Sequence, residues 1–472
     1  MKTILVFISF LTISCSALSQ PDSLQFYLES AARNNPAVLQ KFIEYKAALQ
    51  KVPQVGGLPD PSLSLGVFLT PMELVGGNQV ADIRLMQMFP WFGVLKNAKD
   101  EMSLMAKAKL ESFRDAKLQL IFDVQRTWYE LNRVKQNIRI SEKNIALLQT
   151  IERLTIVKFK AAPSGNGSVP GGNASIQSSA KNASSGSSGM NSMGSNQGNS
   201  NSDPAASPMP GNSMGNSSGS SGLADVYRIQ IEIGDLQNNI DLLKNQLTTI
   251  TAQFNGFLDR PQNAVVSLPD TLLAEHLQQS LLDIPDSILK NNPMLEMLEL
   301  EHQSIEARKQ MVTKMGYPMI GLGLNYSLIN KNPMSTSEMN GKDMVMPMIT
   351  ATLPIYRKKY KAMREETDLM KTANAQTYKA AANSLQTEYY QALQLYKDAN
   401  RRVILYENQY LLASKSLDIL LKNFATATAA LTDILRVRQQ MLDYEYKHIE
   451  AIADNNTSIA WLKRLMASEH VN

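Results

Sequence analysis

The sequence predicts an α+β fold, mostly α-helical, in which a unit of one helix, one β-hairpin and two long helices occurs twice. Three observations support this prediction. The same short motifs recur in the same order in both halves of the 472-residue chain. Each half contains two segments in which apolar residues alternate with small or polar ones. Each half also contains a heptad-patterned segment far longer than the ~11–12 residues of an average helix.

Composition excludes several classes of protein. Hydrophobic residues make up 44% of the chain and charged residues 19%, so most of the chain can fold around buried surface. The 47 lysines and arginines nearly balance the 43 aspartates and glutamates, which excludes a dedicated nucleic-acid-binding protein. The single cysteine excludes a disulfide scaffold and a zinc cluster built from paired cysteines.

The N-terminal segment is predicted to be a secretory signal peptide over residues 1–19. A basic residue precedes an apolar run, and Ala17 and Ser19 supply the small residues needed for cleavage before Gln20. A second interpretation stays open, because the residues up to Cys15 also resemble a lipoprotein signal, in which Cys15 would be lipidated. Both interpretations place the mature chain outside the cytoplasm.

Two repeats are expected after the signal, the first over residues 20–257 and the second over 286–472, joined by a linker at 258–285. Three pairs of motifs mark them: Asn34-Asn35-Pro36 with Asn291-Asn292-Pro293, Phe89-Pro90 with Leu353-Pro354, and the Leu-x-Asp-x-x-Arg sequences at 223–228 and 431–436. The expected elements are a hairpin at 61–89 with long helices at 94–160 and 223–257, and a hairpin at 319–353 with long helices at 358–424 and 429–468.

The four predicted strands have the pattern of membrane-spanning strands. Ile320, Leu322 and Leu324 share one face of a strand, whereas Gly321 and Gly323 share the other. Strands of about ten residues cross a bilayer when tilted, so the apolar face is expected to contact lipid and the other face a lumen. A soluble sheet with one solvated face would show the same alternation. Four strands cannot close a barrel of useful bore, so several chains would have to contribute.

The long helices carry coiled-coil patterns. In the second repeat a row of residues spaced seven apart runs from Ala382 to Phe424, and a companion row runs from Leu385 to Leu420.

An insert of unusual composition separates the long helices of the first repeat. Residues 164–222 contain 19 Ser, 12 Gly and 9 Asn in 59 positions. Such a composition cannot offset chain entropy, and we expect a disordered insert at the tip of a helical hairpin.

These features together resemble the TolC-like outer-membrane efflux proteins, also called outer membrane factors. The resemblance covers nearly the whole chain after the signal except the insert. It implies a homotrimer whose strands form one transmembrane β-barrel in outer-membrane lipid, continued by an α-helical coiled-coil barrel in the periplasm. It also implies an exit duct for a tripartite pump, whose partners are a periplasmic adaptor (membrane fusion protein) and an inner-membrane transporter.

The resemblance also implies a constricted gate at the periplasmic tip. Asp433 stands at the position of the family's gate acid, and Asp225 is its counterpart in the first repeat. Arg228 and Arg436 are expected to pair with an aspartate on a neighbouring helix and hold the tip shut. The alternative is that both aspartates serve only the helix N-termini.

Methionine is abundant, with 24 in the chain, and thioethers are soft ligands suited to Cu(I) and Ag(I). The alternative role of methionine is to fill gaps in apolar packing. Eight methionines are candidate metal contacts, four in the insert and four on the lumen-facing side of the strands: Met190, Met193, Met209, Met214, Met86, Met88, Met346 and Met348.

No enzyme constellation is found. The four histidines are scattered without an HExxH pattern, and neither a phosphate-binding Gly-rich loop before a helix nor a GxSxG motif occurs. We therefore expect no catalysis and no cofactor. The function classes left are a passive efflux duct for drug-like molecules or soft metal ions, the outer-membrane part of a type I secretion system, and a periplasmic adaptor. An adaptor has a single helical hairpin flanked by β-rich domains, which this chain lacks.

Overall fold

The computed structural model describes residues 24–161, 221–426 and 428–468. These residues fall into two compact units, one made of residues up to 144 and from 237 onward, the other of residues 145–236. The predicted signal peptide, Cys15, and the insert methionines Met190, Met193, Met209 and Met214 lie outside the described residues.

The described elements repeat in the predicted order, with two helices rather than the predicted one before each hairpin, which confirms the duplicated fold. The first set is α2 (Leu24–Asn34), α3 (Pro36–Gly56), β1 (Ser62–Leu74), β2 (Gly77–Phe89), α4 (Val94–Ala161) and α5 (Ser221–Phe257). The second set is α6 (Ile284–Asn291), α7 (Pro293–Met315), β3 (Met319–Asn330), β4 (Met344–Thr352), α8 (Arg357–Ala425) and α9 (Leu431–Leu465). Among the described helices, none combines the length and the apolar character that crossing a membrane requires.

The Asn-Asn-Pro motifs form the same corner in both repeats. Asn35 caps α3 by accepting hydrogen bonds from the backbone N–H groups of Ala37 and Val38, and the proline takes the first helical position. The Asn35 side chain also donates to the carbonyl oxygen of Phe257, the last residue of α5, at 3.0 Å. One side chain therefore joins the start of one helix to the end of another.

In the second repeat, Asn292 caps α7 through the N–H of Met294 and donates to the carbonyl oxygen of Leu465, the last residue of α9, at 3.1 Å. Both closing helices end with a left-handed residue two positions later, Asp259 and Ala467, each with φ 52°. The residue after each one donates a backbone hydrogen bond five positions back, which closes a Schellman-type turn.

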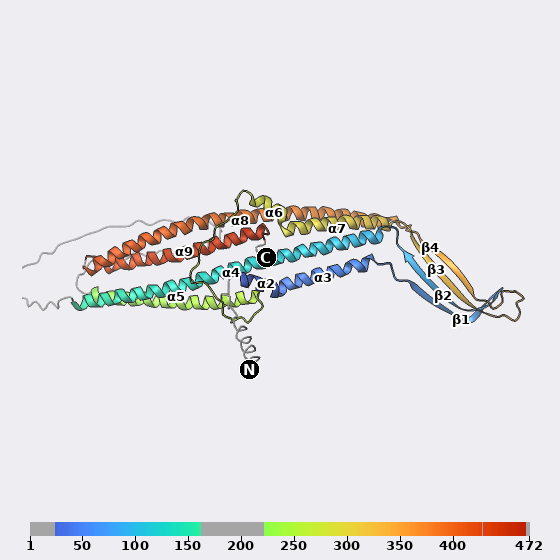
Figure 1. Ribbon diagram of the computed structural model, residues 1–472, viewed down its shortest axis with the longest axis horizontal. Coiled ribbons are helices and arrows are strands. Elements are labelled where there is room, and N and C mark those ends of the chain that lie inside the picture. Colours follow the sequence, from blue (N-terminus) through green and yellow to red (C-terminus); the bar gives the residue numbers. More distant parts are fainter. Residues whose placement is uncertain (1–23, 162–220, 427, 469–472) are drawn as a thin grey trace, which may run out of the picture. The chain divides into compact units, whose positions relative to one another are not determined.

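The four strands form one antiparallel sheet in the order β1-β2-β3-β4, so the hairpins of the two repeats pair through β2 and β3 (Figure 1). Leu65, Ile83, Tyr326 and Val345 lie side by side across the four strands. Apolar side chains at every second position thereby gather on one face of the sheet.

The first hairpin is longer than predicted. The sequence predicts strands at 61–69 and 81–89, whereas β1 continues to Leu74 and β2 begins at Gly77. The pairing register shifts between Val67 and Met72, where Pro71 has no N–H to donate, and then resumes. Gly77 has φ 124°, and a Cβ there would stand 2.5 Å from the carbonyl oxygen of Asn330, so only glycine fits.

The heptad rows of the second repeat lie on the packed side of α8, which runs alongside α7 and α9 (Figure 1). Six of their residues are buried: Leu385, Tyr389, Ala392, Ala399, Leu417 and Phe424.

Each repeat has a hydrophobic cluster at its asparagine corner, the place where Asn35 or Asn292 joins two helices. The first includes Tyr27 and Phe254, whose rings meet edge to face at 5.2 Å, and the second includes Ile284 and Leu462.

Candidate channel surface and gate

One face of the sheet is apolar and exposed. Leu63, Leu65 and Val67 of β1 each keep 69% of their surface exposed, and Leu322 of β3 keeps 51%. Ile349, which pairs with Leu322, is 79% exposed. Soluble proteins rarely expose so many contiguous apolar side chains, so this face requires an apolar environment or a partner.

The opposite face is polar and more enclosed. Ser64 pairs with Arg84, which pairs in turn with Asn325 on the same face. Asn325 and Ser327 are buried, each with 8% of its surface exposed. The residues that the sequence places together on each face therefore do share a face, whereas the contact of one face with lipid and of the other with a lumen stays a prediction.

The four strand methionines lie on this polar face, on the two strands that flank β3. Met86 and Met348 stand on either side of Gly323 in the pairing register. A Cβ on Gly321 would come within 2.6 Å of the Met88 sulfur, and a Cβ on Gly323 within 3.5 Å of the Met348 methyl carbon. Two of the candidate metal contacts thus cover glycine gaps, which gives them a packing role of the kind methionine often has.

The predicted gate residue Asp433 lies in the first turn of α9. Ala430 occupies the N-cap position, and no side chain caps this helix end. The Asp433 carboxylate instead accepts a hydrogen bond from Arg436 at 3.0 Å. We expected Arg436 to pair with a neighbouring helix, whereas in this structure it pairs within α9, one turn away. Both side chains are exposed, so the pair adds little stability.

Asp225 belongs to the other compact unit and is the fifth residue of α5. Burial raises the pKa of its carboxyl group, and the charges of Arg228 and Lys158 oppose that shift. In the same unit, Gln230 donates to Glu152 at 2.8 Å and links α5 to α4. Asp225 is thus a half-buried acid with two nearby cations.

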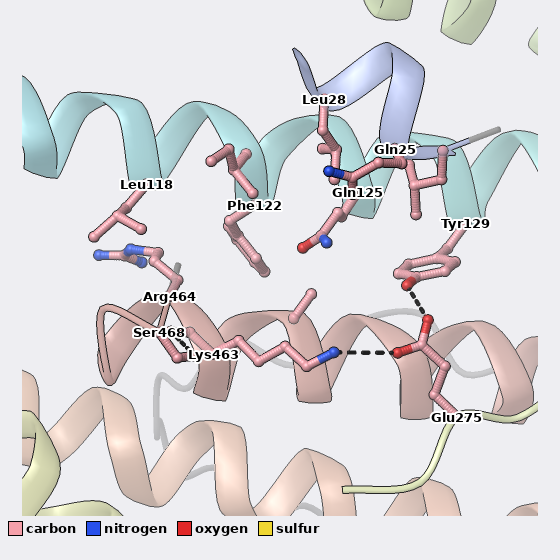
Figure 2. Close-up of a pocket in the computed structure, with 13 residues that line it drawn as sticks. Gln25, Leu28, Leu118, Phe122, Gln125, Tyr129, Glu275, Lys463, Arg464 and Ser468 are labelled. Atoms are coloured by element: carbon pink, nitrogen blue, oxygen red, sulfur yellow. Dashed lines mark hydrogen bonds and ion pairs between the residues drawn. The ribbon is translucent and has the colours of Figure 1, made fainter. Parts of the chain in front are cut away.

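A cavity of about 240 Å³ lies between α2, α4 and α9, with the linker on one side (Figure 2). Tyr129 donates a hydrogen bond to one oxygen of Glu275 at 2.6 Å, and Lys463 stands 3.5 Å from the other oxygen. Burial and the Glu275 charge raise the pKa of Tyr129. Both carboxylate oxygens are engaged, so Glu275 ties the linker to α4 and α9.

Two asparagines of α9 hold the same linker. Asn456 accepts from the backbone N–H of Glu275 and donates to the carbonyl oxygen of Leu273, and Asn455 donates to the carbonyl oxygen of Glu275. The sequence analysis missed this tie, because its members are far apart in the chain and carry no motif. Among the residues that the structure describes, no group of three histidine, cysteine, aspartate or glutamate side chains is placed to hold a metal ion.

The fold is that of solved outer-membrane channels. No protein-family model and no curated protein matches the chain. The outer-membrane channel OprN superposes with a TM-score of 0.69 at 12% identity, over 95% of this chain and 91% of that one. The outer membrane protein VceC from Vibrio cholerae gives 0.67 at 10% identity, over 94% and 96%. The Campylobacter jejuni CmeC outer membrane channel gives 0.67 at 13% identity, over 95% and 88%.

Proposed function

We propose that this chain is the outer-membrane exit duct of a tripartite efflux pump and passively exports small molecules from the periplasm to the exterior. The observation that carries the proposal is a sheet with one exposed apolar face, attached to paired long helices, in a chain with the fold of outer-membrane channels. Outer-membrane lipid would cover the apolar face, and the polar face would line the lumen.

The edges of the sheet support an assembly of several copies. Within the described sheet, β1 and β4 each pair with one neighbour only. A strand in hydrocarbon must have its backbone N–H and C=O groups paired on both edges. Joining β4 of one copy to β1 of the next would satisfy both edges, and the resemblance implies three copies. A periplasmic adaptor and an inner-membrane transporter are the proposed partners.

Two adjacent residues of β1 test the orientation of the sheet. Leu65 lies on the apolar face and Ser64 on the polar face, and both are exposed. Leu65→Arg would place a charge in lipid and cost about 2–4 kcal/mol at mid-depth, so it should abolish pore formation in planar bilayers. Ser64→Arg is the matched control and should still form pores, with altered ion selectivity. Normal pores from Leu65→Arg together with failed assembly of Ser64→Arg would invert the assignment.

We further propose that Asp433 contributes to a constriction that is closed at rest. Replacement by alanine would remove its carboxylate from the tip and free Arg436 from its partner, so cation selectivity should fall. Single-channel recording measures this change, with Asp443→Ala, an exposed acid further along α9, as the control. Unchanged conductance and selectivity would limit Asp433 to a local role at the helix start.

The adaptor alternative predicts a different result in the same recordings. An adaptor would bind other components but would not conduct in a bilayer, whereas a duct should. A type I secretion role would require an exported protein rather than a small molecule. If the cargo is Cu(I) or Ag(I), the candidate contacts for the ion in the lumen are Met86, Met88, Met346 and Met348.

A further inference from the structure

A second cavity, of about 460 Å³, lies between α4, α7 and α8 and shares no lining residue with the cavity in Figure 2. Its walls include two carboxylates, Glu101 and Glu301, one guanidinium group, that of Arg308, and three thioethers, Met102, Met105 and Met370. The heptad patterns of the sequence did not predict it, because α4, α7 and α8 are adjacent only in the folded chain.

Glu101 lies largely buried in this wall. Only 8% of the residue is exposed; no described residue forms a hydrogen bond or a close ion pair with its carboxylate, and the charge of Arg308 acts on it from a greater distance. Burial raises the pKa of Glu101, which means that its charge is costly in the absence of a counter-ion. A largely buried carboxylate without a hydrogen-bond partner is an uncommon feature of a helical wall, and a cation bound beside it would offset the cost of its charge.

The nearby cations of the protein are already engaged. Arg308, which lowers the pKa of Glu101, pairs with Glu366 at 3.4 Å. Burial raises the pKa of Glu301, and the charge of Lys109 opposes that shift. The Lys109 ammonium group also lies 3.9 Å from the Glu44 carboxylate. Against the single positive charge of Arg308, the two carboxylates give the cavity a net negative charge when both are ionised, which a cationic ligand would neutralise.

The remaining walls suit the apolar body of an organic ligand. Methionine side chains are flexible and polarisable and adapt to irregular apolar shapes. A volume of about 460 Å³ is in the range of pockets that hold drug-sized molecules and is far larger than a bare ion requires.

We propose that this cavity binds a hydrophobic organic cation, with Glu101 and Glu301 neutralising its charge and Met102, Met105 and Met370 enclosing its apolar part. The inference rests on the proposed function only in treating such cations as cargo; binding to the cavity is a property of the chain itself.

The test uses ethidium, an aromatic organic cation, and the purified full-length chain in detergent. Fluorescence anisotropy should show saturable binding, and fluorescein, an anion, should not bind. Glu101→Gln and Glu301→Gln keep the side-chain shape and remove the charge, and each should weaken ethidium binding roughly tenfold. Glu299→Gln is the matched control, because Glu299 is exposed on α7 and bonded to Gln303; it should bind as the parent does.

A second variant separates the organic cation from a soft metal. Changing Met102, Met105 and Met370 together to leucine keeps the apolar wall and removes the sulfurs, so ethidium binding should change by less than about threefold. The proposal is overturned if the glutamine variants bind ethidium normally, if the parent shows no saturable binding, or if Ag⁺ binds the parent and the leucine variant loses it while ethidium does not bind.

Pore formation by the same preparation distinguishes the two proposals. A chain that conducts in bilayers but does not bind ethidium loses only this inference. A chain that binds ethidium but does not conduct loses the proposed duct and keeps the binding site. Circular dichroism of each variant excludes misfolding as the cause of lost binding.

Discussion

The corners that close the two repeats use the same bonds in different surroundings. Asn35 and Asn292 each cap a helix and hold the last carbonyl of a closing helix. In the first corner, Asn255 near the end of α5 is fully buried and bonds the following turn. At the matching place in α9, Lys463 reaches out to Glu275 of the linker.

The difference shows how a duplicated unit acquires separate tasks. In both repeats the shared asparagine joins the start of one helix to the end of another. It can do so beside different neighbours because it bonds only to backbone groups. The position two residues before the end of the closing helix is free to differ. In the second repeat it is Lys463, which connects α9 to the linker beside the cavity of Figure 2. Three predictions test this comparison.

The largest expected effect is loss of the corner asparagine. Asn292→Ala should destabilise the fold by about 2–4 kcal/mol, because it removes a helix cap and leaves a buried carbonyl without a donor. Asn35→Ala should cost about 1–3 kcal/mol, because its bond to Phe257 is only partly buried. Thermal unfolding followed by circular dichroism measures both changes.

The asparagines immediately before them are the controls. Asn34 and Asn291 are exposed and bond only to Ser30 and Ser287. Their alanine variants should unfold near the parent temperature. If Asn34→Ala were as destabilising as Asn35→Ala, the corner would not depend on the cap.

A smaller effect is expected at the left-handed residues. Ala467 adopts φ 52° with a Cβ, which strains the backbone by about 1–2 kcal/mol. Ala467→Gly should therefore raise the unfolding temperature, partly offset by the greater freedom of glycine in the unfolded chain. Asp259 has the same φ, but aspartate tolerates it better, so Asp259→Gly should have little effect. Equal gains at both sites would contradict this assignment of strain.

The smallest effect concerns pH. Burial raises the pKa of Glu445 on α9 above its ordinary value of 4.5. Its contribution to stability is present below pH 4.5 and is lost as the pH rises through the folded-state pKa. Glu445→Gln, which copies Gln237 at the matching position of α5, should be more stable than the parent at pH 7. That difference should vanish below pH 4.5, and a difference independent of pH would point to packing instead.

The fold could be predicted largely because its signals are local and repeated. Apolar alternation along β3 and the heptad rows of α8 depend only on which residues lie two, three or seven positions apart. The strand ends were predicted less accurately. The first predicted strand stops at Leu69, whereas the ladder resumes beyond Pro71 and β1 continues to Leu74. Pairing with β2 restores the strand after the proline.

The candidate site was predicted less completely. The sequence identified Asp433 and Arg436 together but not their pairing within one helix, because the choice of partner depends on where the neighbouring helices stand. It grouped the strand methionines correctly on one face but did not reveal that Met88 covers Gly321, a contact between strands far apart in the chain.

The duplicated order of elements, the two faces of the sheet and the packed side of α8 can be read from the sequence, because each follows from periodicity along one segment. The folded arrangement was needed to show that Asn35 and Asn292 each reach the end of a distant helix, that Glu275 holds Tyr129 and Lys463, and that Glu101 lines a cavity beside three methionines. These relations join residues from separate elements. Their energies depend on burial and on the nearest charges, which no single segment of the chain specifies.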